Sequence, residues 1–180
     1  MPAASRLHIA GTLQKLSAEE FRRRLAAVRL LVLDVDGVMT DAGMYYSEAG
    51  DELKKFNTRD GYGIRAVQRA GLPVAVITGE KTRLVARRMK KLGIEIVYQG
   101  IQKKLPVLDE VAARVGIARA EIAYLGDDLG DLPCLEVVGV PCTVADGLPA
   151  NRAAAVYITQ LLGGQGAVRE LCDLLLQARA

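Results

Sequence analysis

Short apolar runs alternate with amphipathic stretches along most of this chain. The first run, residues 30–33, ends abruptly in carboxylates and a glycine, which is typical of a buried parallel strand. Similar runs predict strands at 74–77, 94–98, 121–125 and 140–144, with a short sixth at 155–158. Apolar residues at helical spacing predict five helices. The first follows Ser17, the second follows 57–61 and ends at Gly71, and the third covers 80–92. The fourth is opened by 102–106, and the last runs from the glycines at 163–166 to about Ala178. This alternation predicts an α/β fold, a Rossmann-like open parallel sheet with helices on both faces.

Two segments depart from the alternation. Residues 1–16 lack a regular pattern, and we expect a loosely ordered arm there. Residues 43–47 and 52–56, joined by the turn-like 48–51, predict a β-hairpin. Because the hairpin follows the first strand directly, we expect it to project over the end of that strand as a flap. All 180 residues fit one domain, and 51% hydrophobic residues suffice for one core.

Composition excludes several kinds of partner and chemistry. The net charge is only +3 with both signs interspersed, which argues against a nucleic-acid partner. No apolar run approaches membrane-spanning length and the start has no signal-like apolar region, so we expect no membrane association and a cytoplasmic protein. Three cysteines at unrelated spacings are typical of reduced thiols. His8 is the only histidine, so acid–base work must fall to carboxylates or lysine.

Polar residues that could carry chemistry follow four of the predicted strands. They are Asp34 with Asp36, Thr78, Lys104, and Asp127 with Asp128. Taken singly, each is more often a turn or capping residue or an exposed side chain. In a doubly wound sheet, however, the carboxyl ends of the strands meet at one crevice. We therefore expect these side chains to meet.

The set has the composition that phosphoryl transfer demands. Two carboxylates two residues apart repel unless a cation lies between them, and Mg²⁺ suits carboxylate oxygens. Asp34 is the predicted nucleophile, which forms an aspartyl-phosphate, and Asp36 the general acid and base. Thr78 and Lys104 are predicted to stabilise the phosphoryl oxygens, while Asp127 and Asp128 are expected at the metal, Asp128 as a ligand or an orienting group. No Walker loop is present, so ATP is not indicated.

These motifs resemble those of the haloacid dehalogenase superfamily. The matching segments are 34–41, 77–79, Lys104 and 126–128. Segments 56–64, 98–100 and 163–170 extend the likeness to the phosphatases of 3-deoxy-D-manno-octulosonate 8-phosphate, a lipopolysaccharide precursor, over nearly all of 28–178. The resemblance implies a Mg²⁺ held by Asp34, the Asp36 carbonyl and Asp127, and release of phosphate from that sugar acid.

The resemblance also implies a cap-less, homotetrameric enzyme in which neighbouring subunits close the site. The stretch from Asp41 to Val74 agrees, because it has room only for a hairpin and one helix. Residues that the resemblance brings to the sugar acid, together with Asp36 and Lys104, are Asn57, Thr58, Arg59, Asp60, Gly61, Arg65 and Arg88. Arg88 lies in a basic helix whose ordinary interpretation is a solvated face. A substrate carboxylate favours the functional interpretation for Arg88, because arginine binds carboxylates through two donors.

Two positions keep an alternative substrate open. Glu80 with Lys91 resembles the related phosphatases of nonulosonate 9-phosphates, sugar acids of the sialic acid type. Alternatives from another class are a non-catalytic phospho-acceptor domain and an inactive assembly module. A phospho-acceptor domain of the receiver type should place its acceptor after a middle strand, and this chain has its carboxylate pair after the first. The intact motif set argues against the inactive module.

Overall fold

The computed structural model describes residues 7–50 and 52–180. Within these residues one sheet holds seven strands in the order β1-β9-β8-β7-β2-β5-β6, parallel except for β1 against β9. The strands are β1 (Thr12–Leu13), β2 (Leu30–Leu33), β5 (Val74–Ile77), β6 (Ile96–Tyr98), β7 (Ile122–Leu125), β8 (Val140–Thr143) and β9 (Tyr157–Ile158). The expected α/β fold with an open, mostly parallel sheet is confirmed.

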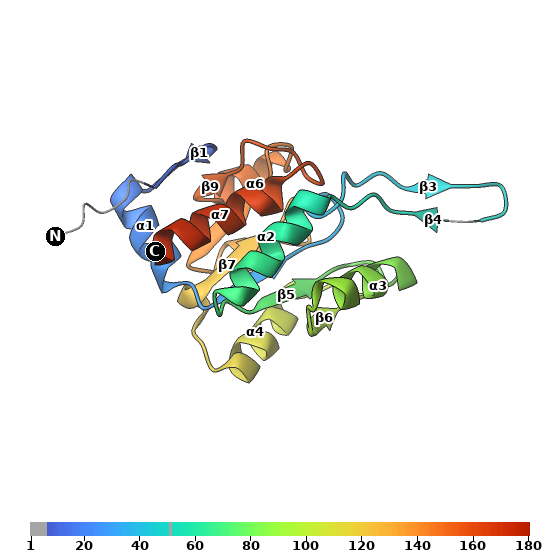
Figure 1. The fold of residues 1–180 in the computed structure, drawn as a ribbon, viewed down its shortest axis with the longest axis horizontal. Helices are drawn as coiled ribbons and strands as arrows, with labels where there is room; N and C mark the ends of the chain where they lie inside the picture. The colour runs from blue at the N-terminus through green and yellow to red at the C-terminus, as the bar shows by residue number, and fades with distance from the viewer. Residues whose placement is uncertain (1–6, 51) are drawn as a thin grey trace.

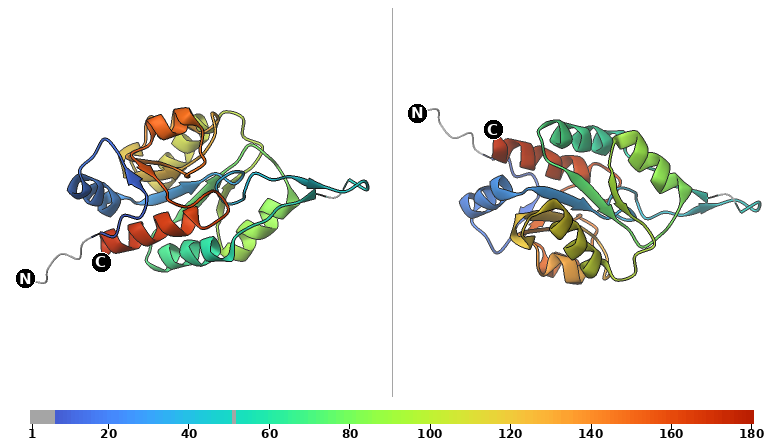
Figure 2. Two further views of the ribbon diagram at one scale, coloured as in Figure 1. Left: turned by 90° about the horizontal axis from the view of Figure 1, so that it is seen from above. Right: turned by 90° about the horizontal axis from the view of Figure 1, so that it is seen from below.

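Helices cover both faces of this sheet (Figures 1 and 2). They are α1 (Ala18–Ala27), α2 (Thr58–Arg69), α3 (Arg83–Leu92), α4 (Lys104–Val115), α5 (Leu132–Leu135), α6 (Pro149–Ala154) and α7 (Ala167–Arg179), with a 3₁₀ turn at Arg119–Glu121. Among the described residues, no helix combines the length and the apolar character needed to cross a bilayer.

Side-chain alternation along the strands divides the interior into two cores. In β2, Leu31 and Leu33 pack with α1, α2, α3 and α7 on one face, while Leu30 and Val32 pack with α4 and α5 on the other. Both sets are fully buried, because successive side chains of a strand point to opposite faces. This double burial explains why β2 has no polar position before Asp34.

Most predicted boundaries agree to within a few residues, and α3 shows why one does not. The pattern predicts a helix from residue 80, yet α3 begins at Arg83. Thr82 is extended, with φ −132° and ψ 153°, and its hydroxyl accepts the Val85 N–H at 3.2 Å. This N-cap fixes the start of the helix and leaves residues 79–81 as a loop across the end of β5.

The N-terminal segment differs from its prediction. Residues 12–13 form β1, which pairs antiparallel with β9, and the Tyr157 hydroxyl accepts the Gly11 N–H at 2.9 Å. Leu7, Ile9, Leu13 and Leu16 pack against the core. The expected loose arm is therefore wrong for residues 7–16, because pairing with an edge strand orders a segment that has no pattern of its own. Residues 1–6 lie outside the described part.

The predicted hairpin is present but pairs over a shorter length. Strands β3 (Tyr45–Tyr46) and β4 (Glu52–Leu53) are antiparallel and extend away from the body of the molecule (Figure 1). Residue 51 of the predicted turn lies outside the described residues. Tyr45, Tyr46 and Leu53 have exposed fractions of 50%, 65% and 64%, so the paired part of the hairpin carries apolar surface on both strands.

A glycine segment at 163–166 packs directly on the loop that follows β2. The Gly164 N–H donates to the Val38 carbonyl at 2.9 Å. A Cβ on Gly163 would lie 1.8 Å from the Gly37 carbonyl oxygen, closer than any side chain can come. The two loops touch through their backbones and so hold the turn after Asp36 in place.

We expect Gly163→Ala to lower the free energy of unfolding by about 2–3 kcal/mol, because the new methyl group must displace backbone. Gly116→Ala is the matched control: it has φ +71° but open space around it, and should cost about 1 kcal/mol. Urea unfolding of both variants measures the difference. A cost for Gly163→Ala no larger than that of the control would show that the two loops are not tightly packed.

Candidate active site

Four strand ends surround a cavity of about 500 Å³ at the carboxyl edge of the sheet. We call it the strand-end cavity. Its lining residues are Asp34, Asp36, Thr78, Gly79, Glu80, Ile101, Gln102, Lys104, Asp128, Leu129 and Gly130. Asp34 directly follows β2, and its N–H donates to the Leu125 carbonyl at 3.1 Å. Residues more than 90 positions apart in sequence therefore share one depression, as parallel strands dictate.

Lys104 is the central cation of this cavity. It is the first residue of α4, and its side chain is only 6% exposed. The ammonium lies 2.9 Å from Asp34 Oδ1 and 2.6 Å from Asp131 Oδ1. Burial lowers the pKa of Lys104, but the two carboxylates outweigh burial and the net shift is upward. Lys104 is therefore a buried ammonium ion.

Asp131 organises the acidic loop after β7. Its Oδ1 accepts from Lys104 and from the buried Tyr124 hydroxyl at 2.7 Å, while its Oδ2 accepts the N–H groups of Asp127 and Asp128 at 3.1 and 3.3 Å. Both carboxylate oxygens thus have partners. Asp131 fixes the positions of Lys104 and of the Asp127–Asp128 backbone.

Asp34, Asp127 and Asp131 form a group with ligand geometry. Each offers one carboxylate oxygen, and these oxygens lie within 4.8 Å of one another. Asp127 Oδ1 is buried and has no hydrogen-bond partner among the described residues. Asp34 and Asp127 can therefore hold a hard divalent cation, a set that fits the predicted Mg²⁺. Asp128 is exposed, and its carboxylate accepts the Leu129 N–H at 2.6 Å.

The protonation of this group reflects its crowding. Burial and the neighbouring Asp131 raise the pKa of Asp34 to about 7, against the attraction of Lys104. Burial, with Asp34 and Asp131 nearby, raises the pKa of Asp127 to about 8. Without a metal, the site therefore retains protons near neutral pH, and a divalent cation supplies the charge that ionises these carboxyls.

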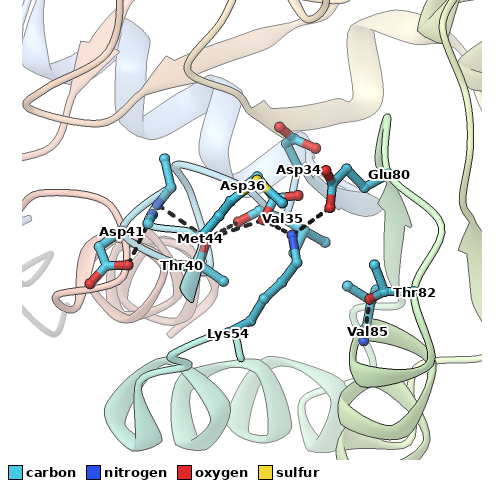
Figure 3. Close-up of polar contacts among 12 residues, drawn as sticks. Asp34, Val35, Asp36, Thr40, Asp41, Met44, Lys54, Glu80, Thr82 and Val85 are labelled. Atoms are coloured by element: carbon cyan, nitrogen blue, oxygen red, sulfur yellow. Dashed lines mark hydrogen bonds and ion pairs between the residues drawn. The ribbon is translucent and has the colours of Figure 1, made fainter. Parts of the chain in front are cut away.

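A second ionic group, which includes Asp36 and Glu80, lies beside Asp34 (Figure 3). Lys54, which follows β4, places its ammonium 2.6 Å from Asp36 Oδ1 and 2.8 Å from Glu80 Oε2. Thr78 ends β5, is 1% exposed, and its Oγ1 has no hydrogen-bond partner among the described residues. A phosphoryl oxygen in the cavity is the kind of acceptor that this hydroxyl lacks.

The residues expected at the sugar acid are only partly brought together. Asp36, Glu80 and Lys104 line the strand-end cavity. The other residues, which do not line it, are Asn57, Thr58, Arg59, Asp60, Gly61, Arg65, Arg88 and Lys91. They lie on α2, on α3 and at the residue before α2. Within the described part of one chain, these eight residues therefore lie outside the strand-end cavity.

Several of these outlying residues have structural partners. The Asn57 side chain accepts the Arg59 N–H at 2.8 Å and caps α2. Arg88 donates to the Asn57 carbonyl at 2.9 Å and lies over the Phe56 ring. Asp60 is buried and accepts the Arg169 N–H at 2.8 Å. These contacts tie α2, α3 and α7 together.

Two further links belong to this outlying group. Arg65 donates to the Lys91 carbonyl at 2.5 Å, which connects α2 to α3 through exposed residues. A Cβ on Gly61 would lie 2.6 Å from the Arg88 guanidinium, so glycine at this position lets Arg88 pass close to α2. Thr58 and Arg59 are exposed at the start of the same helix.

The sequence pattern did not predict a role in the site for three residues that contact it: Asp131, Tyr124 and Lys54. Asp131 had a signal, because it is the third carboxylate of the segment 126–131. Tyr124 is an apolar-looking position inside β7, and Lys54 is one of two adjacent lysines in the hairpin. Their roles depend on contacts between distant segments, which spacing alone does not show.

Known proteins have a similar fold and a related sequence. Residues 80–168 match the family of haloacid dehalogenase-like hydrolases. KdsC, the 3-deoxy-D-manno-octulosonate 8-phosphate phosphatase of Escherichia coli K12, is 49% identical over 152 residues, which are 84% of this chain and 81% of that protein. The structure of the same phosphatase from Yersinia pestis is 42% identical over 94% of each chain, with a TM-score of 0.89.

A third relative carries ligands. The phosphatase from Moraxella catarrhalis, in a crystal structure with a magnesium ion, a phosphate ion and a KDO molecule, is 38% identical over 89% of this chain and 92% of that chain, with a TM-score of 0.88. Fold and sequence thus define a haloacid dehalogenase-like hydrolase. More narrowly, the chain belongs to the family of 3-deoxy-D-manno-octulosonate 8-phosphate phosphatases. The resemblance expected from the motifs is confirmed.

We expect the metal-free protein to lose stability as the pH rises towards 8. An unfolded aspartate releases its proton near pH 4, whereas Asp34 and Asp127 hold theirs to about 7 and about 8 in the folded state. The stabilisation from these protons is complete below pH 4 and is lost as the pH passes through the folded values.

Urea unfolding in excess EDTA between pH 5 and pH 8.5 measures this loss. Asp127→Asn is the matched variant, because its neutral amide removes one of the two titrations, and its free energy of unfolding should fall less steeply over this range. Parallel curves for the wild type and the variant would show that Asp127 does not hold a proton in the folded protein.

Proposed function

We propose that this chain is a Mg²⁺-dependent phosphatase that hydrolyses 3-deoxy-D-manno-octulosonate 8-phosphate. Relatives at 38–49% identity carry this activity in their names, and one of them holds magnesium, phosphate and KDO. The observation that carries the proposal in this chain is the buried contact of Asp34 with Lys104 beside the unpartnered Asp127 oxygen. We also propose that the product serves lipopolysaccharide synthesis and that the enzyme acts in the cytoplasm.

In the first step, a carboxylate oxygen of Asp34 attacks phosphorus, the bond from phosphorus to the sugar oxygen breaks, and an aspartyl-phosphate forms. Asp36 gives its proton to the leaving sugar oxygen. In the second step, Asp36 takes a proton from water, whose oxygen attacks phosphorus and releases inorganic phosphate and the Asp34 carboxylate. Lys104 and Thr78 stabilise the phosphoryl oxygens in both steps.

Mg²⁺ would be held by Asp34 and Asp127, where it would neutralise the charge that builds on the phosphoryl group. Asp131 keeps Asp127 and Lys104 in place for this purpose through its four hydrogen bonds. The Asp36 main-chain carbonyl and Asp128 remain proposed contributors to the metal site.

We further propose that copies of this chain assemble as a homotetramer in which neighbouring subunits close the site. The strand-end cavity has no cap of its own, and a phosphatase site must exclude bulk water. The exposed apolar residues of the hairpin, Tyr45, Tyr46 and Leu53, suit contact with a second copy. Arg59 and Arg65, which lie outside the cavity of their own chain, would reach substrate in such an assembly.

A second candidate substrate is a nonulosonate 9-phosphate. Glu80 lines the strand-end cavity, so the cavity wall presents a carboxylate, which accepts hydrogen bonds from sugar hydroxyls. An arginine at this position would donate hydrogen bonds instead and so favour a different sugar. Lys91, the other residue behind this alternative, is exposed on α3. Phosphate release from the two sugar acids, compared side by side, separates the candidates by their kcat/KM ratio.

Asp34→Asn should lower kcat by about a thousandfold or more, because an amide cannot act as the nucleophile. Asp109→Asn is the matched control, since Asp109 is half-buried and pairs with Arg119 outside the strand-end cavity. It should retain activity within about twofold of the wild type. Phosphate release with and without EDTA is the measurement. Substantial turnover by folded Asp34→Asn, or by the wild type in excess EDTA, would contradict the proposal.

Glu80→Arg should shift preference towards the octulosonate and away from the nonulosonate. The substitution replaces the carboxylate 2.8 Å from the Lys54 ammonium with a second cation, so the charge of the cavity wall is reversed. We expect about a tenfold change in the ratio of the two kcat/KM values. An unchanged ratio would show that residue 80 does not discriminate between the sugars.

A further inference from the structure

We propose that Lys54 is a positioning residue for the acid–base group Asp36, and that it works through a bridge between Asp36 and Glu80. The proposal rests on the phosphatase function proposed above and adds a residue to it. Lys54 directly follows β4, and Figure 3 shows its side chain reaching towards both carboxylates. Neither the motif set nor the strand-end pattern includes this residue.

The Lys54 side chain is buried and makes short contacts with two carboxylates. Its side chain is 1% exposed, whereas those of Asp36 and Glu80 are 31% and 40% exposed. The ammonium is 2.6 Å from Asp36 and 2.8 Å from Glu80. A buried ammonium within hydrogen-bond distance of two carboxylates fixes their orientations more strongly than an exposed ion pair does.

The bridge selects one oxygen of Asp36 for chemistry. Oδ1 accepts from Lys54, with a longer contact of 3.4 Å from the Thr40 hydroxyl. Oδ2 is buried and has no hydrogen-bond partner among the described residues. With Oδ1 held, the proton that passes to the leaving sugar oxygen, and later the one taken from water, is carried by Oδ2.

Glu80 is the second carboxylate of the bridge. Its Oε2 accepts from the same ammonium as Asp36, at 2.8 Å. Lys54 thereby orients the acid–base group and ties it to the loop after β5.

The position of Lys54 also links the hairpin to catalysis. Strand β4 ends at Leu53, so the residue that leaves the hairpin is the one that contacts Asp36. The next residue, Lys55, is exposed and pairs with Asp41 at 3.0 Å. Two adjacent lysines therefore have different environments, and Lys55 is the matched control for Lys54.

The test compares two substrates that differ in their need for an acid. A sugar phosphate has a poor leaving group that must be protonated as it departs, whereas p-nitrophenolate leaves without a proton. In Lys54→Met, we expect kcat/KM for 3-deoxy-D-manno-octulosonate 8-phosphate to fall at least about tenfold. The same variant should keep kcat/KM for p-nitrophenyl phosphate within about threefold, because kcat/KM reports the departure of the leaving group and not the later hydrolysis of the aspartyl-phosphate, which needs Asp36 for both substrates. Lys55→Met should leave both values within about twofold of the wild type.

Equal losses on the two substrates, or no loss on either, would overturn the proposal. Circular dichroism and retained p-nitrophenyl phosphate turnover show that the variant is folded. If Lys54→Met does not fold, Lys54→Arg is assessed by the same ratio, since it keeps the charge, and its loss must again fall more heavily on the sugar phosphate. A wild type inactive on both substrates would instead reject the proposed function itself.

Discussion

The buried ammonium of Lys104 lies among carboxylates that outnumber it, and the site depends on this imbalance. Lys104 contacts Asp34 and Asp131, and Asp127 adds a third carboxyl within 4.8 Å. Burial makes such crowding costly unless a further cation is present. A divalent metal at Asp34 and Asp127 would remove the excess negative charge, which together with burial raises the pKa of both carboxyls.

Strand ends, a helix start and hydrogen bonds hold these groups together. Asp34 and Thr78 follow β2 and β5 directly, and both adjoining strands are fully buried. Lys104 begins α4, and Asp131 is fixed by four hydrogen bonds. Gly163 and Gly164 pack on the turn after Asp36. Each reacting group therefore has at most a few rotatable bonds between it and a rigid element, as preorganised catalysis requires.

The sheet was predictable because both faces of its strands are buried. Residues 30–33 and 74–77 are continuous apolar runs. Ser17 caps α1 and Gly71 closely follows α2, as the pattern predicts. Strand β1 was not predictable, because two residues on an edge strand leave no periodic pattern. The start of α3 at Arg83 depended on the Thr82 cap, which the basic run after it obscured.

Site residues were predictable to the extent that they lie at strand ends. Asp34, Asp36, Thr78 and Lys104 are found together in one cavity, as parallel strands require. Lys54 was not predictable, because its contact with Asp36 depends on how the hairpin leaves the sheet. Arg65 and Lys91 do not line the cavity of their own chain, and no local sequence pattern distinguishes a residue at the cavity from one elsewhere on α2 or α3.

The most direct test of the central claim is a crystal structure of the protein with Mg²⁺ and beryllium trifluoride, which mimics a phosphoryl group on a carboxylate. The account predicts the fluoride adduct on Asp34, with Lys104 and Thr78 in contact with its fluorides and Mg²⁺ bound by Asp34 and Asp127. An adduct on another residue, or Mg²⁺ bound away from Asp34 and Asp127, would contradict it.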